Sequence, residues 1–445
     1  MNMTQSPTDP HFVQDPYPFY ARARAKGHLL WWEDYNMMAA FSHEAVQTLL
    51  KDRRFGREIP AEFAAPRPDH LAPFYAIDDH SMLELEAPRH TRLRGLVLRA
   101  FTSRRIKALG PEIAALTHSL IDDFPPQSNQ CTARSSPHGN DEFDLLPALA
   151  APLPVRIIAR LLGVPEDMAP DLLRWSNAMV AMYQAGRTRE IEDAAARAAG
   201  DFACYIGTYI DTRRSDPRND LITELINAEQ DGNRLNRDEM IATCILLLNA
   251  GHEATVHTIG NGLTALLATP GLPPLKTLTA PENIPATTEE ILRFDPPLHM
   301  FTRTAYETVT LFGHTFKRGD QVALLLASAH RDPAIWSDPD RFDPGRAIKT
   351  NSAFGAGPHF CIGAPLARLE LQIALPILIQ RCAHLRRSPP PIYANTYHFH
   401  GLTRLKVKTT LQILLVPKYL RDELIANGDQ EGAAPLSPPS IVHWP

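Results

Sequence analysis

The residues with the most distinctive chemistry lie in one glycine-rich segment towards the carboxyl end of this 445-residue chain. Residues 354–370 read FGAGPHFCIGAPLARLE. The glycines allow a flat ligand to approach the backbone closely, and Pro365 falls in the first turn of the helix predicted to follow Cys361. Because backbone N–H groups at a helix N-terminus favour a thiolate, Cys361 could be an axial metal ligand, a nucleophile with His359 as its base, or an inert buried thiol.

The spacing of this segment favours the first of these interpretations. The pattern F-x-x-G-x-H-x-C-x-G is complete, and the segment resembles the haem-binding loop of the cytochromes P450, the haem-thiolate monooxygenases. The resemblance implies haem b (iron protoporphyrin IX) as cofactor and Cys361 as its proximal iron ligand. It also implies that His359 binds a haem propionate, that Phe354 packs beside the sulfur, and that Gly363 belongs to the same cofactor-binding loop. An axial thiolate donates electron density that favours O–O cleavage.

Three further basic residues fit the same cofactor. His90 and Arg94 are four residues apart on one face of a helix, a spacing that by itself would describe a solvated basic surface. The resemblance implies that both contact the haem propionates, and that Arg303 does so from a strand. Cationic donors form the strongest hydrogen bonds to carboxylates, so two propionates would account for four basic groups spread over the chain.

Glu290 and Arg293 form a second motif, E-x-x-R, on a short helix. An i,i+3 pair of this kind is by itself an ordinary surface ion pair. Beside the cysteine loop it resembles the structural E-x-x-R pair of the cytochromes P450. That resemblance implies that the pair, together with Arg341 or Arg346, locks the segment ahead of the haem loop.

A long helix is predicted from Asn236, which caps it with Glu239 three residues later, to the stop at residues 269–270. Its apolar pattern is interrupted midway by the sequence AGHEAT at residues 250–255. Polar groups in the middle of a buried helix must be hydrogen-bonded or functional. The segment is similar to the family pattern A-G-x-[D/E]-T-[T/S], which lines the site of oxygen activation.

The segment departs from that pattern at one position, because Ala254 replaces the threonine that hydrogen-bonds the oxygen being activated. The resemblance implies that Gly251 opens a groove for O2 and that Glu253 relays protons, with a raised pKa if it is buried. Thr255 lies about 100° further round the helix and is not expected to replace the missing hydroxyl. The proton must then come from ordered water or from a hydroxyl on the substrate.

These motifs predict an oxidoreductase that inserts one oxygen atom of O2 into a small organic substrate. Two alternatives remain open. The chain could be a haem protein that couples phenols or uses peroxide, or a hydrolase or transferase without haem that uses Cys361 as nucleophile and His359 as base.

The composition agrees with an enzyme and excludes other classes. The chain has 45 basic and 50 acidic residues, a net charge of -5 and 44% apolar residues, which argues against a nucleic-acid partner. No segment is apolar enough to span a membrane and the amino terminus has no signal-like pattern, so we expect a cytoplasmic protein. The five cysteines are far apart and form no CxxC pair, which indicates neither a disulfide framework nor a zinc site.

The pattern of apolar residues predicts a mostly α fold with small β-sheets. We expect one large haem-binding domain over residues 1–428, a surface loop at 125–141 and a disordered tail at 429–445. A hairpin is predicted at 308–316 and a buried strand at 321–326. A late strand pair is predicted at 405–415. Besides the long helix, helices are predicted at 88–108, 147–162, 167–184, 190–214 and 220–227.

The expected electron-transfer partners follow from the cofactor motifs that the sequence lacks. It has no flavin or iron–sulfur fingerprint, so electrons are expected from a ferredoxin or flavodoxin with its own NAD(P)H-dependent reductase. A basic patch on the cysteine side could receive that carrier. Its candidate residues are Arg99, Arg104, Arg105, Lys107 and Arg368. Substrate contacts are expected from a loop at 64–85, from the helix segment 179–183, from Leu248, and from residues 297–301 and 400–402.

Overall fold

The computed structural model describes residues 1–125, 142–184, 186–228 and 232–411. The predicted tail at 429–445 lies outside the described residues, as does the predicted loop at 125–141 apart from its first residue, and Cys131 lies in that loop. Helices dominate and the sheets are small, which confirms the predicted fold class. Within the described residues no helix is long and apolar enough to cross a membrane.

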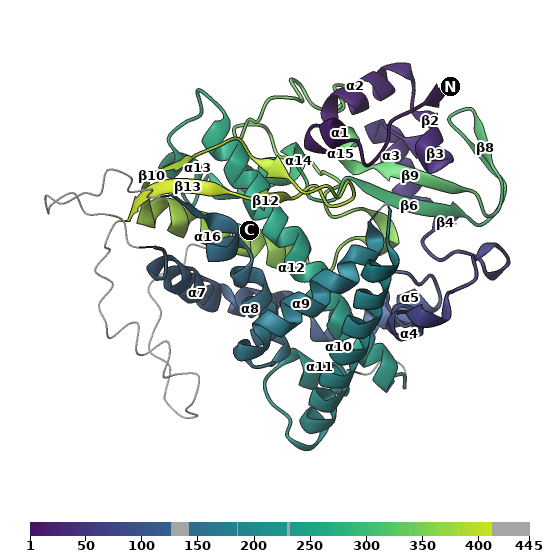
Figure 1. The fold of residues 1–445 in the computed structure, drawn as a ribbon, viewed down its shortest axis with the longest axis horizontal. Helices are drawn as coiled ribbons and strands as arrows, with labels where there is room; N and C mark the ends of the chain where they lie inside the picture. Colours follow the sequence, from purple (N-terminus) through teal and green to yellow (C-terminus); the bar gives the residue numbers. More distant parts are fainter. Residues whose placement is uncertain (126–141, 185, 229–231, 412–445) are drawn as a thin grey trace, which may run out of the picture.

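The helices account for most of the described chain (Figure 1). The α-helices are α1 Pro10–Gln14, α2 Tyr17–Lys26, α3 His43–Lys51, α4 Ala72–Asp78, α5 Arg89–Ala100, α6 Ser103–Ala108, α7 Gly110–Asp122, α8 Pro152–Leu162, α9 Ala169–Val180, α10 Arg189–Ser215, α11 Leu221–Asn227, α12 Arg237–Ala268, α13 Leu275–Leu278, α14 Ile284–Phe294, α15 Leu326–Ala329 and α16 Ala364–Arg381. Single 3-10 or π turns are η1 Glu33–Tyr35, η2 Ala61–Phe63, η3 Asp69–Leu71, η4 Leu146–Ala150, η5 Glu166–Met168, η6 Ala181–Tyr183 and η7 Gly357–His359.

The strands form four small sheets. They are β1 Asn2–Met3, β2 Leu29–Trp32, β3 Met37–Ala40, β4 Phe55–Gly56, β5 Glu142–Asp144, β6 Met300–Ala305, β7 Val309–Leu311, β8 His314–Phe316, β9 Gln321–Leu325, β10 Cys382–Arg387, β11 Ile392–Tyr393, β12 Leu402–Arg404 and β13 Lys406–Leu411. The largest sheet has the order β1-β2-β3-β9-β6-β4, a second has the order β10-β13-β5, and β11-β12 and β7-β8 are two-stranded.

Most of the predicted elements are present. The predicted hairpin is β7 with β8, and the predicted buried strand is β9. The predicted helix at 88–108 is wrong as a single element, because the chain breaks after α5 and Thr102 caps a new helix, α6, by accepting from the Arg105 amide. Residues 412–415 of the predicted late strand pair lie outside the described residues, and the described part is a single strand, β13, which pairs with β10 on one side and β5 on the other.

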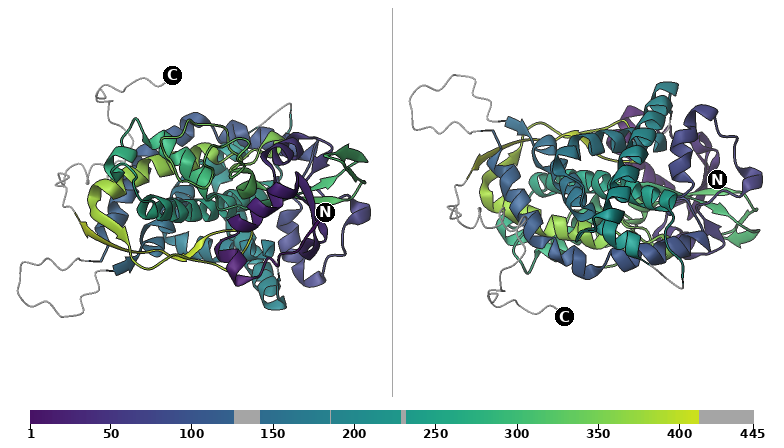
Figure 2. Two further views of the ribbon diagram at one scale, coloured as in Figure 1. Left: turned by 90° about the horizontal axis from the view of Figure 1, so that it is seen from above. Right: turned by 90° about the horizontal axis from the view of Figure 1, so that it is seen from below.

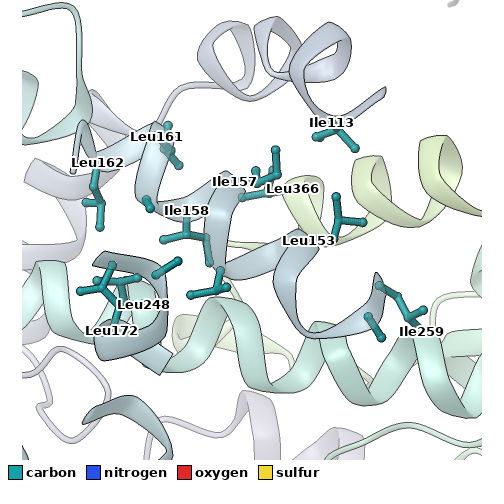
Figure 3. Packing of buried hydrophobic residues seen from close by; sticks show 14 of the residues in the cluster. Ile113, Leu153, Ile157, Ile158, Leu161, Leu162, Leu172, Leu248, Ile259 and Leu366 are labelled. Carbon is teal, nitrogen blue, oxygen red and sulfur yellow. The ribbon is translucent and has the colours of Figure 1, made fainter. Parts of the chain in front are cut away.

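The long helix α12 begins and ends where the sequence predicts. The Asn236 side chain accepts from the Glu239 amide, and the Glu239 carboxylate accepts from the Asn236 amide, which completes a capping box. Figures 1 and 2 show α12 running through the middle of the molecule, with the largest sheet at one end. α8, α9, α10 and α14 pack against it. Figure 3 shows the dry core on its α8 side, where Ile158 meets Leu248 and Leu172.

The largest sheet is the main element that the sequence pattern did not reveal. Strands β2 and β3 have the sequences LLWW and MMAA, which are too short and too uniformly apolar to show an alternating period. They pack against an aromatic cluster formed by Phe12, Phe19 and Trp32. Tertiary packing therefore defines these strands more than their own sequence does.

We predict opposite stability effects for two glycine-to-alanine changes in helices. Gly262 of α12 faces α14 so closely that an added Cβ would lie 2.6 Å from Ile291 Cγ2. Gly262→Ala should therefore lower the free energy of unfolding by about 1–3 kcal/mol through overpacking. Gly200 of α10 has open space around it, so Gly200→Ala should raise the free energy by about 0.5–1 kcal/mol. Urea unfolding of both variants measures these changes in the free energy of unfolding, and equal effects of the two substitutions would contradict the prediction.

Candidate functional site

The cysteine loop forms a tight turn that leads into α16. The Cys361 amide donates to Phe354 O at 3.0 Å, which closes the loop. Gly357 has a φ of +69°, and an added Cβ there would lie 2.5 Å from Leu50 O, so only glycine fits. Burial raises the pKa of the Cys361 thiol, while the amides of Gly363 and Ala364 oppose that rise. The thiol lies at the N-terminus of a helix, and a metal cation bound to its sulfur would deprotonate it.

Phe354 is held at the start of this loop by a cation. The guanidinium of Arg368 lies over its ring, 4.6 Å from the centroid, and Arg368 Nη2 donates to Glu289 at 3.1 Å. The aromatic ring and the thiol are therefore fixed by the same first turns of α16. Arg368 is paired and half-buried, so it is a poor candidate for a partner-binding cation.

His90 and His359 meet across the loop although 269 residues separate them in sequence. Their ring centroids are 4.2 Å apart. Burial, and then the positive charge of His359, lowers the pKa of His90 to about 4. His359 Nε2 lies 2.8 Å from Glu86 Oε1. The sequence analysis did not find Glu86, because a lone glutamate ahead of Ala87 carries no motif.

Arg303 is a buried cation that lacks an acidic partner. It is 3% exposed and lies in β6, and among the described residues its side chain donates only to the neighbouring Thr302 O, at 2.8 Å. Within the described residues it makes no ion pair. Burial, and then repulsion by Arg57, lowers its pKa to about 10. An unpaired buried charge is costly, so this position fits a ligand that brings its own carboxylate.

Arg94 completes the basic group and lies beside the cysteine loop. Its Nη2 donates to Phe360 O at 2.6 Å, and its charge lowers the pKa of the Cys361 thiol. The predicted set of His90, Arg94, Arg303 and His359 is therefore gathered around Cys361 and Glu86 from separate elements. A thiol next to unpaired cations fits a metal-centred group that carries carboxylates, as haem does.

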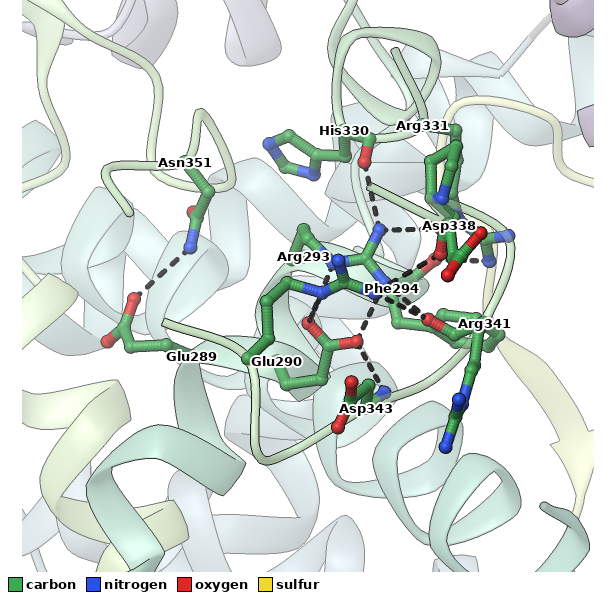
Figure 4. Close-up of polar contacts among 12 residues, drawn as sticks. Glu289, Glu290, Arg293, Phe294, His330, Arg331, Asp338, Arg341, Asp343 and Asn351 are labelled. Carbon is green, nitrogen blue, oxygen red and sulfur yellow. Dashed lines mark hydrogen bonds and ion pairs between the residues drawn. The ribbon is translucent and has the colours of Figure 1, made fainter. Parts of the chain in front are cut away.

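The E-x-x-R motif is a buried network and not a surface pair (Figure 4). Arg293 is 1% exposed and Glu290 4% exposed in their side chains. Arg293 donates to both carboxylate oxygens of Glu290 at 2.7 Å, and to the carbonyl oxygens of His330 at 2.9 Å and Pro339 at 2.8 Å. Bidentate pairs of this kind have fixed geometry, so Arg293 ties α14 to two distant loops.

Arg341 and Arg346, the two candidates for the third member of this network, take part in different ways. The side chain of Arg346 approaches Glu290 Oε2 at 3.6 Å, whereas Arg341 supplies only its backbone carbonyl, which accepts from Arg293 Nη2 at 3.1 Å. The Asp343 amide also donates to Glu290, at 2.7 Å. Figure 4 shows the 338–343 loop wrapped around the ion pair. The network thus shapes the chain ahead of the cysteine loop.

The centre of α12 passes close to α8. An added Cβ on Gly251 would lie 2.3 Å from Ile158 Cδ1, so the two helices meet there. The Thr255 hydroxyl donates to Gly251 O at 2.9 Å and is thereby committed to the helix backbone. Ala254 has no polar side-chain atom to offer at the next position. The described part of α12 therefore presents no free hydroxyl at residues 254–255.

The pKa of Glu253 differs from the one predicted from sequence. Burial would raise its pKa, but hydrogen bonds and charge from His252 and His257 hold that pKa well below its usual range. His252 Nε2 lies 3.4 Å from Glu253 Oε2, and His257 Nε2 lies 3.1 Å from Oε1. The raised pKa predicted from sequence is wrong because His257 is one turn further along the same helix face, where it reaches the carboxylate.

The predicted substrate-contact segments occupy several environments. The region 64–85 is not a continuous loop, because it contains η3 and α4. Leu248 is 1% exposed in the core beside Ile158 (Figure 3). His257 packs against the chain at Gly401, where an added Cβ would lie 2.0 Å from His257 Nδ1. The predicted segment at 400–402 therefore lies directly against the central helix.

Comparison with known proteins agrees with this geometry. The family model described as "Cytochrome P450" matches residues 28–273 and 276–412. The cytochrome P450 monooxygenase PikC of Streptomyces venezuelae is 36% identical over 386 residues, which covers 85% of this chain and 87% of PikC. The mycinamicin IV hydroxylase/epoxidase of Micromonospora griseorubida is 36% identical over 353 residues, or 78% and 82% of the two chains.

A solved structure has the same fold. P450BioI, crystallised in complex with an acyl carrier protein ligated to hexadec-9Z-enoic acid, superimposes with a TM-score of 0.82 at 31% sequence identity. The match covers 90% of this chain and 99% of that one.

The unpaired cation at Arg303 generates a prediction about haem binding. Arg303→Met removes a buried charge, so the haem-free protein should be at least as stable in urea as the unchanged chain. The loaded protein should lose haem to excess apomyoglobin about tenfold faster, because a charged hydrogen bond to a carboxylate is lost.

A matched buried arginine serves as control. Arg213 is paired with Asp220, both nearly buried, so Arg213→Met should destabilise the protein with or without haem. An unchanged rate of haem loss in Arg303→Met would contradict a propionate contact at this residue.

Proposed function

The chain belongs to the cytochrome P450 family, and from that premise we propose that Cys361 holds the iron of haem b as its proximal ligand. The protein is a cytochrome P450 monooxygenase and its substrate is organic. When bound, haem b would supply the iron at which O2 is reduced and one oxygen atom passes to the substrate. The observation that carries the assignment is the Cys361 thiol at the N-terminus of α16 beside Arg94, which, like the buried Arg303, forms no ion pair with any described residue.

The basic residues around the cysteine loop would hold the two propionates. Arg303 would donate from β6, and His90 with Arg94 would donate from the same face of α5. His359 would be oriented by Glu86, which accepts from its Nε2. Because these groups come from separate elements, cofactor binding would also tie those elements together. Phe354 and Gly363 would shape the loop around the sulfur.

Proton delivery is where this chain would differ from relatives with the usual threonine. Glu253 would remain a carboxylate at neutral pH and pass protons through His257, because both histidines stabilise its charged form. Ile158 Cδ1 occupies the space that the missing Cβ of Gly251 leaves, so Gly251 alone would not open a groove for O2. Neither Ala254 nor Thr255 offers a free hydroxyl. The last proton donor would then be ordered water or a hydroxyl of the substrate itself.

The relatives suggest the kind of substrate. The mycinamicin IV hydroxylase/epoxidase is named for the oxidation of mycinamicin IV, and P450BioI was crystallised in complex with an acyl carrier protein. We propose a small organic substrate with an oxygen function near the oxidised carbon, which would complement Ala254. Hydroxylation is the leading reaction.

Phenol coupling and the use of peroxide are the alternative reactions on the same cofactor. The further alternative, a hydrolase or transferase without haem, has no support in the geometry, because the His359 ring nitrogen faces Glu86 and not Cys361. The predicted cytoplasmic location stays a prediction.

Electrons would arrive at the cysteine side from a ferredoxin or flavodoxin that has its own NAD(P)H-dependent reductase. Of the five predicted cations, Arg105 is paired with Glu224 and Arg368 with Glu289. Arg99, Arg104 and Lys107 are exposed and form no ion pair with any described residue. They lie on α5 and α6, and α6 packs against α16. An acidic carrier would meet these charges beside the cysteine loop.

The reduced carbon monoxide complex tests the thiolate assignment. The reduced, CO-treated protein should show the absorption band near 450 nm that gives the family its name. Cys361→Ser should lose that band while far-UV circular dichroism is retained, because the serine oxygen is a much weaker donor. Cys382→Ser, a change to another buried cysteine, should keep the band. A normal band in Cys361→Ser would overturn the assignment.

Substitution at position 254 tests substrate-assisted protonation. Ala254→Thr should change the product formed per NAD(P)H consumed by at least about twofold, a part of the roughly 10²-fold that general acid catalysis supplies. Ala254→Val adds the same volume without a hydroxyl and is the matched control. The threonine variant should also tolerate a substrate analogue that lacks the neighbouring oxygen. Unchanged coupling in Ala254→Thr with the true substrate would contradict assistance by that substrate.

A further inference from the structure

Three buried side chains outside the cysteine site converge on one point. Asp295 follows α14, His299 precedes β6, and His400 precedes β12. One ligand atom from each lies within 4.8 Å of the other two. The exposed fractions are 7% for Asp295, 0% for His299 and 3% for His400. None of these residues belongs to a motif that the haem assignment uses.

The separations between these atoms are wrong for hydrogen bonds. His299 Nε2 lies 3.8 Å from Asp295 Oδ1, and His400 Nε2 lies 3.6 Å from the same oxygen. Hydrogen bonds of this type are about 2.7–3.2 Å long. His299 Nε2 is fully buried and has no hydrogen-bond partner. A buried polar atom without a partner is costly, so something further should bind there.

The same separations suit a metal ion. Bonds of about 2.0–2.1 Å to His nitrogen and Asp oxygen in a tetrahedron place neighbouring donor atoms about 3.3 Å apart. The two measured distances exceed that edge by only 0.3 and 0.5 Å. Small side-chain rotations would therefore close the three donors around an ion. Two imidazoles and one carboxylate form a donor set that zinc commonly takes, with a fourth position left for water.

Neighbouring tyrosines hold the donors in the orientation that a metal requires. Tyr20 Oη lies 2.9 Å from His299 Nδ1, which leaves Nε2 pointing at the cluster. Asp295 accepts from Tyr17 Oη at 2.6 Å and from Tyr393 Oη at 2.8 Å. The Tyr393 ring also stacks on His400, with centroids 3.8 Å apart. Outer hydrogen bonds of this kind fix ring orientation in metal sites.

The backbone of the site is fixed by the central helix. Asn261 of α12 donates its Nδ2 to Asp295 O at 3.2 Å and to His400 O at 2.8 Å. The His400 amide donates to Pro297 O at 2.8 Å. Two of the three donors are therefore held by one side chain, and the segments that carry them are joined directly. The donors are brought together before any ion binds.

The charges around the site favour a cation of this type. Asp295 brings an acidic ligand to the two imidazoles, a combination that zinc sites commonly use. Arg331 is the nearby cation, and its charge is balanced by Asp340 at 3.0 Å.

An ion could reach the site from solvent. A cavity of about 440 Å³ is lined by Asp295 and His400 together with the exposed residues Gln14 and Asp15. The cavity is large enough to hold several water molecules. It supplies both an entry path and the water that an open fourth position needs.

We propose that Asp295, His299 and His400 form a structural site for one divalent metal ion, zinc by its donor set. The ion joins the connection between α14 and β6 to the segment ahead of β12. The site is independent of the haem assignment, because it shares no residue with the cysteine loop or its basic group.

Zinc binding to the full-length, untagged, haem-loaded protein tests this proposal. After treatment with EDTA, titration with zinc chloride in a calorimeter should show one site per chain, and zinc should raise the melting temperature. Retention of one zinc after dialysis should be visible by elemental analysis. No zinc at one equivalent, together with an unchanged melting temperature, would overturn the proposal.

Single substitutions assign the bound zinc to these residues. His299→Gln and His400→Gln should each weaken zinc binding more than tenfold, because loss of an outer hydrogen bond alone already costs about 10–100-fold. His314→Gln, a change to a histidine in the separate two-stranded sheet of β7 and β8, should bind zinc as the unchanged chain does. Haem absorbance and circular dichroism show whether each variant is folded. Full affinity in both folded site variants would overturn the assignment.

X-ray absorption at the zinc edge identifies the atoms that bind the zinc without the use of any variant. The zinc-loaded protein should show nitrogen and oxygen neighbours at about 2.0–2.1 Å with the outer scattering of imidazole. A sulfur neighbour at about 2.3 Å would place the zinc on a cysteine and overturn the proposal.

Discussion

The buried ion pair between Glu290 and Arg293 is the interaction on which the rest of the site depends. Arg293 satisfies one carboxylate and the carbonyl oxygens of His330, Pro339 and Arg341, so a single guanidinium ties α14 to two distant loops. Removing either partner would leave a buried charge without compensation, at a cost of about 3–5 kcal/mol. The chain that reaches Cys361 leaves from this network, so the position of the thiol depends on it.

The central helix α12 connects the two halves of the chemistry. Its middle carries Glu253, the residue proposed to relay protons, and its later turns carry Asn261, which holds the backbone of the proposed metal site. Close approaches at Gly251 and Gly262 let neighbouring helices reach the α12 backbone. A change in the packing of this helix would therefore alter both the region around Glu253 and the proposed metal site.

The titrating groups show how burial and partners compete in this protein. Burial alone would raise the pKa of Cys361 and of Glu253 alike. Two histidines reverse the direction for Glu253, whereas the amides and cations near Cys361 only oppose the rise. The difference is physical: a histidine within hydrogen-bond reach of a carboxylate outweighs its desolvation, but scattered dipoles do not outweigh that of a thiol. An iron ion would supply the missing charge at Cys361.

The sequence by itself determined the long helix and its capping box, the cysteine loop, the E-x-x-R pair and the mostly α class, because each is encoded by residues close together in the chain. Only the tertiary structure brought Glu86 to His359, left Arg303 without an ion pair to any described residue and gathered Asp295, His299 and His400. These contacts join segments up to hundreds of residues apart or depend on which face of a helix is buried. The local pattern of apolar residues does not predict such contacts, because they depend on how distant segments pack against one another.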